Sequence, residues 1–440
     1  MVFKHEKINT KNKTENSFFI NKGFYIFVQI KYIKMKFLAK FILFISIISC
    51  QQNITYENRI NDDVNYLSND KLEGRKTGSK GEQIAADYIA DRFKSLKIEA
   101  KGTNTYFQDF SFNKPSNPHD QVSFSETEND SMVFSKNVIG YIDNNTEHTV
   151  VIGAHYDHLG YGGEGSLYVG SEIHNGADDN ASGTALMLDL ASQLTFNNRN
   201  NNYLFIAFSG EEMGLLGSNY FVKNPTIDLS SVNYMINLDM VGRLKEDKSL
   251  AVYGVGTSPI FKQTINSNNE SFNIIENESG VGPSDHTSFY INDIPVLHFF
   301  TGQHSDYHKP SDDADKVNFE GIKEISDYIY SIISDLNDNG KLSFKKTKNE
   351  TEEVPSFKVS LGVMPDYMFN KGGMRIDAVT QDRPAYKAGL IKGDIVLKMG
   401  EHNVEDMMGY MKALSKFKPG DSTAVVVKRD NDTIKRKVTF

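Results

Sequence analysis

The chain has 440 residues, of which 39% are hydrophobic and 24% are charged, a balance typical of a globular protein with two or three domains and not of a disordered one. The formal net charge is -9 and falls to -16 without the first 49 residues, because these carry nine Lys and two Glu. So acidic a body argues against nucleic acid or an anionic membrane surface as the main partner, and we expect no nucleic acid partner.

The first 49 residues are predicted to be an N-terminal extension and an export signal. Residues 36–49 are a basic lead and an apolar run that is too short to span a bilayer comfortably, and the run stops at Cys50. The residues Ile47 to Cys50 resemble a bacterial lipobox, in which the cysteine is lipidated and becomes the first residue of the mature protein. We therefore expect a lipoprotein of the bacterial cell envelope, on the periplasmic or surface side of the outer membrane. An uncleaved anchor helix is the alternative, and either Met1 or Met35 could be the start.

Cys50 is the only cysteine, so the exported body can form no internal disulfide. Beyond it the chain divides into three parts. Residues 51–345 alternate apolar, strand-like runs with amphipathic helices, which predicts an α/β three-layer sandwich with a mostly parallel central sheet. Residues 346–356 are charged and polar and are predicted to be a linker. Residues 357–440 are predicted to form a second, small β-rich domain.

The large domain contains one clear helix signal and five strand signals. Apolar residues at helical spacing predict an amphipathic helix over residues 82–96, on the outside of the domain. Short apolar runs rich in β-branched and aromatic residues predict central strands at residues 137–142, 149–158, 202–212, 232–240 and 294–300. Polar residues that could bind a metal lie at or just after most of these runs. Because ligands converge at the carboxyl ends of strands in open α/β sheets, we expect these residues to share one site.

The first two motifs supply a histidine and a pair of aspartates. In GAHYDHLG, His155 ends a strand, and Asp157 is placed to orient its imidazole, whereas His158 is a weaker candidate. In NGADDNASG, Asp178 and Asp179 precede a predicted helix. Helix capping is the alternative for these acids, but it explains a pair poorly.

The next motifs add carboxylates and further histidines. In FSGEEMGLLGS, the adjacent Glu211 and Glu212 point to opposite sides of an extended backbone, so one can bind metal while the other faces substrate or water. Asp239 is a single carboxylate in an apolar strand, where an unpaired charge would cost several kcal/mol, and a metal is its simplest partner. The loop HSDYHKPSDD supplies both His304 and His308, and the spacing alone does not choose between them.

The series GAHYDH, GADDNASG, SGEEMGLLGS, NLDMVGR, SDHTSFY and DYHKPSDD, over about residues 60–335, resembles the co-catalytic di-zinc aminopeptidase family that includes the bacterial leucine-type and Streptomyces-type secreted enzymes. The resemblance implies two Zn²⁺ per chain, with Asp179 as the bridging ligand. The implied ligands are His155, Asp179 and Asp239 for one zinc, and Asp179, Glu212 and His308 for the other, which leaves Asp178 as a neighbour. Imidazole and carboxylate ligands suit zinc.

The resemblance also implies the other roles in the site. Glu211 would be the general base, Asp157 the partner of His155, and Asp285 and His286 contacts to the substrate or behind the ligands. The peptide bond after Asp179 would be cis. We therefore expect a zinc-dependent exopeptidase, most readily an aminopeptidase that removes N-terminal residues by attack of a zinc-bound water.

Other reactions remain open at this point. Related families include carboxypeptidase-like and dipeptidase-like enzymes and single-zinc glutaminyl cyclases. A catalytically silent surface lipoprotein that only binds peptides is the non-enzymatic alternative.

The C-terminal residues resemble a bacterial-type PDZ domain in the segments 360–367, 374–379, 384–400, 404–417 and 422–440. The resemblance implies that the loop Leu361, Gly362 and Val363 presents backbone N–H groups to a peptide carboxylate, with the peptide added as a strand. The expected partners are thus peptide substrates and, at this domain, a peptide or protein C-terminus. A domain that only packs against the catalytic domain is the alternative.

Overall fold

The structure of the protein is a computed structural model that describes residues 59–113, 123–124, 132–163, 165–195, 199–347, 358–366, 368–369, 371–380 and 382–440. The expected export signal, Cys50 and most of the expected linker lie outside the described residues. Among the residues that are described, no helix is both long and apolar enough to cross a bilayer.

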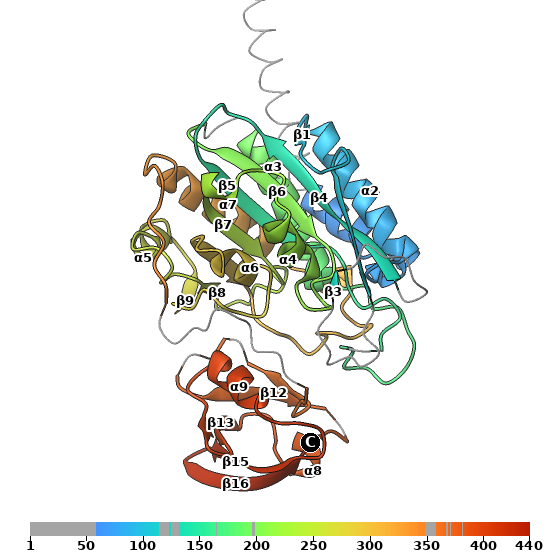
Figure 1. The fold of residues 1–440 in the computed structure, drawn as a ribbon, viewed down its shortest axis with the longest axis vertical. Helices are drawn as coiled ribbons and strands as arrows, with labels where there is room; N and C mark the ends of the chain where they lie inside the picture. Colours follow the sequence, from blue (N-terminus) through green and yellow to red (C-terminus); the bar gives the residue numbers. More distant parts are fainter. Residues whose placement is uncertain are drawn as a thin grey trace, which may run out of the picture. The chain divides into compact units, whose positions relative to one another are not determined.

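Four parallel strands form the centre of a ten-stranded sheet (Figure 1). In spatial order they are β6 (Asn202–Phe208), β5 (Thr149–His155), β7 (Val232–Leu238) and β10 (Val296–Phe300). Every residue in these strands is buried, which explains their near-continuous apolar sequences, since helices cover both faces of a parallel sheet. Each lies within one of the runs that the sequence predicts to be a central strand.

Shorter or more exposed strands complete the sheet on either side. Beyond β6, antiparallel pairing adds β4 (Met132–Ile142), β2 (Phe107–Asn113), β3 (Ser123–Phe124) and β1 (Glu99–Ala100). Beyond β10, β8 (Ser249–Tyr253) pairs antiparallel and is followed by β9 (Asn273–Asn277), which is parallel to it. The parallel region is therefore central, where the predicted ligands gather.

Helices cover both faces of this sheet. Side chains of β5 alternate, so Ile152 packs with the larger core cluster on one face and Val151 with a second cluster on the other. The first face carries α2 (Lys80–Ser95), α3 (Gly183–Leu194), α5 (Phe261–Ser267) and α7 (Phe319–Leu336), and the second carries α4 (Leu216–Lys223) and α6 (His286–Tyr290). The expected three-layer α/β sandwich is confirmed. The helix expected at residues 82–96 is α2.

Four short helical turns connect these elements. They are η1 (Asp70–Arg75), η2 (Ala177–Ser182), η3 (Leu229–Ser231) and η4 (Ala314–Lys316). The turn η2 carries Asp178 and Asp179 and is interrupted by non-helical backbone at Asp179 and Asn180. A cis peptide bond joins these two residues, as the family resemblance implies.

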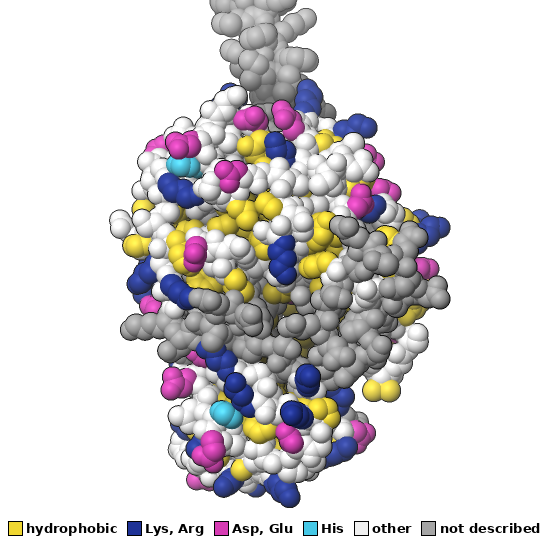
Figure 2. All heavy atoms as spheres, in the orientation of Figure 1, with side chains coloured by type: hydrophobic (Ala, Val, Ile, Leu, Met, Phe, Trp, Pro, Cys, Tyr) yellow, Lys and Arg dark blue, Asp and Glu magenta, His cyan; other side chains and the backbone are white. Residues whose placement is uncertain are grey.

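The C-terminal domain is a separate antiparallel sheet with its own core. Its strands are β11 (Val363–Pro365), β12 (Met374–Val379), β13 (Ile395–Met399), β14 (His402–Asn403), β15 (Ser422–Arg429) and β16 (Asp432–Thr439), and its helices are α8 (Pro384–Lys387) and α9 (Met407–Leu414). The expected β-rich domain is confirmed. On the face drawn in Figure 2, basic and acidic side chains of the described residues lie interspersed instead of forming one basic tract.

Candidate metal centre

The carboxyl ends of three neighbouring strands place the candidate ligands together. His155 is the last residue of β5, and Asp239 directly follows β7. Glu211 and Glu212 lie in the turn that follows β6. Because β5 is parallel to both β6 and β7, these three strand ends meet at one edge of the sheet.

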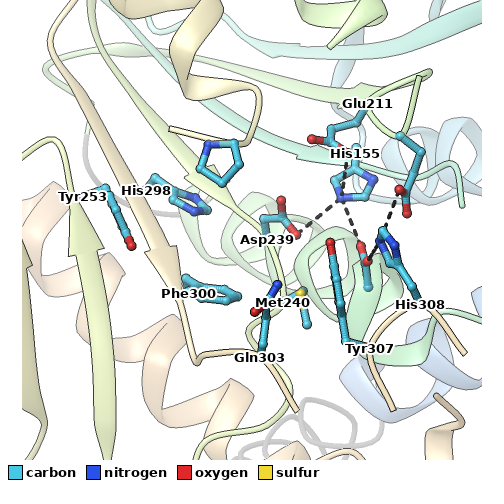
Figure 3. A pocket seen from close by; sticks show the side chains of 13 residues that line it. His155, Glu211, Asp239, Met240, Tyr253, His298, Phe300, Gln303, Tyr307 and His308 are labelled. Carbon is cyan, nitrogen blue, oxygen red and sulfur yellow. Dashed lines mark ion pairs between the residues drawn. The ribbon is translucent and has the colours of Figure 1, made fainter. Parts of the chain in front are cut away.

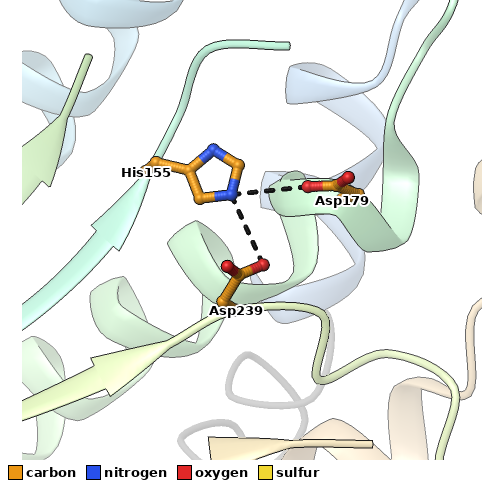
Figure 4. Close-up of side chains that lie close together, drawn as sticks. All are labelled: His155, Asp179 and Asp239. Atoms are coloured by element: carbon orange, nitrogen blue, oxygen red, sulfur yellow. Dashed lines mark ion pairs between the residues drawn. The ribbon is translucent and has the colours of Figure 1, made fainter. Parts of the chain in front are cut away.

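His155, Asp179 and Asp239 form the first cluster (Figure 4). The Nε2 atom of His155 lies 3.4 Å from Oδ1 of Asp179 and 3.4 Å from Oδ1 of Asp239. The imidazole is 1% exposed, so the contacts are shielded from water. One nitrogen and two carboxylate oxygens that converge in this way fit a divalent cation, and zinc accepts this donor set.

A second cluster shares Asp179 with the first (Figure 3). The Nε2 atom of His308 lies 3.1 Å from Oδ2 of Asp179 and 3.3 Å from Oε2 of Glu212. His158 joins them, since its Nδ1 atom is 2.8 Å from Oε1 of Glu212 and 3.9 Å from Oδ2 of Asp179. The two oxygens of Asp179 thus face different clusters, which is the arrangement that a bridging carboxylate requires.

The two histidines of the loop after β10 point to different partners. His308 faces the second cluster, whereas Nε2 of His304 lies 3.1 Å from Oδ2 of Asp178. The side chain of Asp178 also accepts a hydrogen bond from the backbone N–H of Gly242 at 2.6 Å. Of these two histidines, His308 is therefore the one that the structure brings to the clusters, and Asp178 lies beside His304.

The tight turn that presents Asp179 depends on a glycine. Gly176 has a φ of 56°, in the left-handed region. A Cβ atom at this position would lie 2.1 Å from the carbonyl oxygen of Asp179 and 2.6 Å from the ring of His158. Any larger residue would push Asp179 or His158 out of place.

Glu211 lies beside the first cluster without belonging to it. Its Oε2 atom is 4.0 Å from Nε2 of His155, and its side chain is 12% exposed. Burial raises the pKa of Glu211 well above its ordinary value, and the carboxylates of Asp239 and Glu212 raise it further. Glu211 therefore holds a proton readily.

Glu212 shows the opposite behaviour. Burial alone would raise the pKa of Glu212, but the imidazoles of His308 and His158 lower it to about 2. Adjacent carboxyl groups whose pKa values are pushed apart are typical of a pair in which one group transfers protons and the other remains ionised. The pKa values of the adjacent Glu211 and Glu212 are thus shifted in opposite directions.

Asp157 connects the histidine of the first cluster to Glu211. Its Oδ1 atom accepts a hydrogen bond from the backbone N–H of Glu211 at 3.1 Å and lies 3.7 Å from Nδ1 of His155. Its Oδ2 atom accepts a hydrogen bond from the hydroxyl of Thr77 at 2.9 Å. The carboxylate is fully buried and is held by these contacts in a fixed orientation.

Asp285 and His286 lie behind the pocket wall. Both are buried, and neither is among the described side chains that line the pocket. The ring of His286 stacks on that of His298, with centroids 4.5 Å apart and an angle of 6° between the planes. Burial raises the pKa of Asp285 to about 7. An influence of His286 on a substrate would therefore pass through His298, which does line the pocket.

Next to the clusters the pocket widens into an uncharged recess (Figure 3). Its walls are the side chains of Met240, Tyr253, Pro283, His298, Phe300, Gln303 and Tyr307. Burial lowers the pKa of His298 to about 4, so this imidazole is neutral at neutral pH. The ring of Tyr307 stacks on that of His308 with a centroid distance of 3.8 Å. Sequence reasoning missed these residues, although Tyr307 directly precedes a predicted ligand.

Arg75 is a further residue that the sequence does not single out. It is 1% exposed. Its guanidinium donates to the backbone carbonyl of Tyr156 at 2.8 Å, of Asn175 at 2.7 Å and of Gly176 at 3.1 Å. It therefore ties the segment after His155 to the turn before Asp179. A fourth contact goes to the backbone carbonyl of Leu67, eight residues before it. No spacing rule could find the other three partners, since they lie 81 to 101 residues away.

Comparisons with known proteins agree with this architecture. Residues 137–333 match the sequence profile described as peptidase family M28, and residues 343–439 match the PDZ domain. An aminopeptidase of Bacillus subtilis is 30% identical over 215 residues, which cover 45% of this chain and 44% of that protein. The chain spans less than half the length of the first curated relatives it matches.

Two solved structures show the same fold. A zinc aminopeptidase from Bacillus subtilis superimposes with a TM-score of 0.50 at 18% identity and covers 67% of this chain and 97% of that one. A glutaminyl cyclase from Bacteroides thetaiotaomicron superimposes with a TM-score of 0.50 at 15% identity and covers 63% of this chain and 97% of that one. At these identities the likeness concerns the fold.

Proposed function

We propose, because the chain carries a domain of peptidase family M28 followed by a PDZ domain, that it is a zinc-dependent exopeptidase, and specifically an aminopeptidase that uses two zinc ions. The observation that carries this proposal is Asp179, whose two oxygens face two separate clusters of potential ligands. Glu211, with its raised pKa, lies next to them. A structural metal site would need no such group.

The potential ligands form two sets, one for each zinc ion. His155, Asp179 and Asp239 would hold one zinc. Asp179, Glu212 and His308 would hold the other, with His158 in contact with the Glu212 carboxylate. When bound, zinc supplies a Lewis acid for the scissile carbonyl and lowers the pKa of water.

The protein's own groups supply the proton transfers. Glu211 accepts a proton from the attacking water and delivers it to the amine that leaves the scissile bond. A carboxyl group with a raised pKa suits both steps, because it takes up the proton easily and is still acidic enough to release it to an amine. The Asp157 carboxylate accepts a hydrogen bond from the backbone N–H of Glu211 and lies beside the ring of His155. It therefore fixes the position of the general base, Glu211, relative to the metal ligand His155.

The pocket combines the ligand clusters with an uncharged recess. Four acidic side chains, those of Asp179, Glu211, Glu212 and Asp239, line the pocket with His155 and His308. Two zinc ions would balance the negative charge of these side chains. The uncharged recess beside the clusters accommodates the side chain of the residue to be removed, and we expect uncharged residues there.

The test is a mixture of peptides, half of them N-acetylated, incubated with protein that begins at residue 51, with and without chelator and added zinc. Stepwise loss of N-terminal residues from free peptides only, abolished by chelator and restored by zinc, is the expected result. Trimming from the C-terminus would make the protein a carboxypeptidase. Loss of ammonia from N-terminal glutamine without cleavage would make it a glutaminyl cyclase, the activity of one protein with the same fold. No change would favour a binding protein.

We propose that the mature protein is exported and attached to the cell envelope through lipid on Cys50. The basic lead and short apolar run before this residue support the proposal. Stable anchoring needs more than one acyl chain, because a single chain binds a membrane only marginally. Mass spectrometry of the protein from a bacterial host is expected to show an acylated N-terminal cysteine, and an unmodified N-terminus upstream of Cys50 would exclude the anchor.

For the PDZ domain we propose capture of a peptide C-terminus along β11. This strand is at one edge of its sheet, so it has an unpaired side to which a peptide strand can add. Gly362 precedes it with a φ of 72°, and a Cβ there would lie 2.1 Å from Cβ of Arg383. Replacing Gly362 by a bulky residue is therefore expected to abolish binding of labelled C-terminal peptides, as measured by fluorescence anisotropy. Unchanged binding would contradict this mode of docking.

A further inference from the structure

Beneath the two clusters lies a layer of charged residues that do not touch the expected metal positions. We call Asp178, Arg243, His304 and Asp312 the anchor network. Asp178 and Asp312 are fully buried, and the side chains of Arg243 and His304 are 15% and 11% exposed. Charges buried to this degree are costly unless each has a partner. Their partners lie on the segments that carry the metal ligands.

Asp312 holds the backbone of the bridging aspartate. Its Oδ2 atom accepts hydrogen bonds from the backbone N–H groups of Asp178 at 3.0 Å and of Asp179 at 3.1 Å. Hydrogen bonds to an ionised carboxylate are stronger than neutral ones. The Asp312 side chain therefore fixes the peptide from which the Asp179 side chain projects.

Arg243 extends this anchor to two further segments. Its Nη2 atom lies 3.1 Å from Oδ1 of Asp312 and 3.3 Å from Oδ2 of Asp306. Arg243 follows the ligand Asp239 by four residues, and Asp306 precedes the ligand His308 by two. One guanidinium thus connects the chain after β7 with the loop that carries His308.

His304 adds a weaker, electrostatic contact. The backbone N–H of Asp306 donates to Nδ1 of His304 at 3.2 Å, so in the neutral ring the proton belongs on Nε2, which lies 3.1 Å from Oδ2 of Asp178. Nε2 has no hydrogen-bond partner among the described residues, but Oδ1 of Asp312 also lies 4.0 Å from it. Asp178 is fixed instead by its bond from the backbone N–H of Gly242 at 2.6 Å.

We propose that Asp312, acting with Arg243, is a positioning residue that sets the zinc affinity of the centre by fixing Asp179 and His308 in one geometry. The inference rests on the proposed metal centre and goes beyond it, because neither residue belongs to the expected ligands. Replacing residues that orient metal ligands typically costs about 10- to 100-fold in affinity. We expect a loss of at least about tenfold when either is replaced.

The PDZ domain offers a matched control. Asp394 is fully buried, and its carboxylate contacts Nε and Nη2 of Arg429 at 2.7 and 2.8 Å. It also accepts a hydrogen bond from the backbone N–H of Ile391 at 3.0 Å. This is the same chemistry as in Asp312, in a different domain and on segments that carry no expected ligand. Asp394→Asn therefore measures what the loss of a buried Asp–Arg contact does to the fold alone.

The experiment compares the full chain with its Asp312→Asn, Arg243→Lys and Asp394→Asn variants. Zinc affinity is measured by competition with a chromophoric chelator, zinc per chain by elemental analysis, and stability by urea unfolding of the metal-free proteins. Asp312→Asn keeps a carbonyl oxygen for the two backbone N–H groups but places an uncharged group next to Arg243. Arg243→Lys keeps the charge but replaces the planar guanidinium, whose Nη2 contacts both carboxylates, by an ammonium group on a more flexible stem.

The expected result is a zinc affinity at least about tenfold lower in Asp312→Asn and Arg243→Lys, and unchanged within about twofold in Asp394→Asn. A variant that carries both Asp312→Asn and Arg243→Lys is expected to lose less zinc-binding free energy than the two single variants lose in sum, because both residues belong to one network. An equal zinc affinity in the wild type and Asp312→Asn would overturn the inference. A loss of zinc affinity in Asp394→Asn as large as that in Asp312→Asn would overturn it too. If Asp312→Asn does not fold, Arg243→Lys decides alone. A wild-type chain that binds no zinc would instead refute the proposed function.

Discussion

The two ends of the central parallel strands bury polar side chains in opposite ways. At the amino end, Asn202 accepts a hydrogen bond from the backbone N–H of Asn144 at 2.9 Å and donates to the carbonyl of Thr146 at 2.9 Å. Asn233 likewise accepts from the backbone N–H of Leu342 at 2.7 Å and donates to the carbonyl of Gly340 at 2.8 Å. Both side chains satisfy their hydrogen bonds within the protein.

At the carboxyl end the polar groups are not satisfied in this way. His155, Asp179, Asp239 and Glu212 crowd together, and Nε2 of His158 has no hydrogen-bond partner among the described residues. Buried polar groups normally have partners. A buried polar group with its own hydrogen-bond partner stabilises the fold, whereas a cluster of buried polar groups without enough partners indicates where a ligand binds.

The largest effect is expected at the carboxyl end, from Glu211→Gln. The amide cannot accept a proton from water, so turnover should fall at least about 100-fold, the usual scale for the loss of a general base. Steady-state kinetics would measure the loss, and elemental analysis should show that zinc remains bound. Near-normal turnover with full zinc content would exclude Glu211 as the base.

Zinc itself should stabilise the carboxyl end. A ligand that binds only the folded state adds about 2.7 kcal/mol to the free energy of unfolding at a free concentration 100 times its dissociation constant. Urea unfolding with excess zinc and with chelator would measure this increment. Asp239→Ala should lose part of it, while a variant at the amino end should keep it. If zinc raises the free energy of unfolding of Asp239→Ala as much as that of the wild type, the metal does not bind at Asp239.

A replacement at the amino end should affect stability alone. Asn233→Ala leaves the buried N–H of Leu342 without a partner and also removes the bond to the carbonyl of the exposed Gly340. An unsatisfied buried group costs about 1–3 kcal/mol. We expect a lower free energy of unfolding in urea, with turnover per folded molecule unchanged within about twofold. Loss of turnover without loss of stability would break the distinction between the two ends.

Glu82 tests the limits of the comparison through an effect of about 1.4 kcal/mol for each unit of pH. It lies near the carboxyl end of β6 but has partners in the protein, since the hydroxyl of Ser135 donates to it at 2.8 Å and the backbone N–H of Gly78 at 2.6 Å. Burial raises the pKa of Glu82 from 4.5 to about 8, and Asp157 adds to the effect. Glu82 therefore keeps its proton in the folded protein at pH values where the unfolded chain has lost it.

The contribution of Glu82 to the free energy of unfolding decreases as the pH rises. Between pH 4.5 and about 8 the folded state binds one more proton than the unfolded state at this group, so its contribution to the free energy of unfolding falls by about 1.4 kcal/mol per pH unit as pH rises. Above about pH 8 the contribution is constant. Glu82→Gln should remove this slope, so the stability difference between variant and wild type grows with pH in that window. Parallel curves from urea unfolding at pH 5 to 9 would contradict the protonated state.

The sequence predicts the central strands and the motifs at their ends because both depend on local patterns. Residues 149–158 and 232–240 are apolar runs that carry His155 and Asp239 near their ends, and these runs contain β5 and β7. The sequence pattern does not predict β8 and β9. β9 is half-exposed and contains Asn and Glu, so its pattern resembles a loop.

Parts of the site that depend on distant contacts could not be predicted. His304 and His308 lie four residues apart on one loop, and only the positions of Asp178 and Asp179 separate their roles. The contacts of Asp312 with the backbone of Asp178 and Asp179 join residues 133 and 134 positions apart. Such pairings follow from the packed fold and leave no periodic signal in the sequence.

Arg75 has a consequence for the order in which the molecule assembles. Besides the nearby carbonyl of Leu67, its guanidinium contacts residues that lie 81 to 101 positions further along the chain, so these three contacts form only when that part of the chain has been brought next to Arg75. The expected ligands themselves extend from His155 to His308. Contacts of such long sequence separation form late in folding, because the entropy of closing a long loop is lost before any contact compensates for it. The nascent chain therefore has no metal pocket, and the protein is expected to acquire zinc in the compartment where it completes folding.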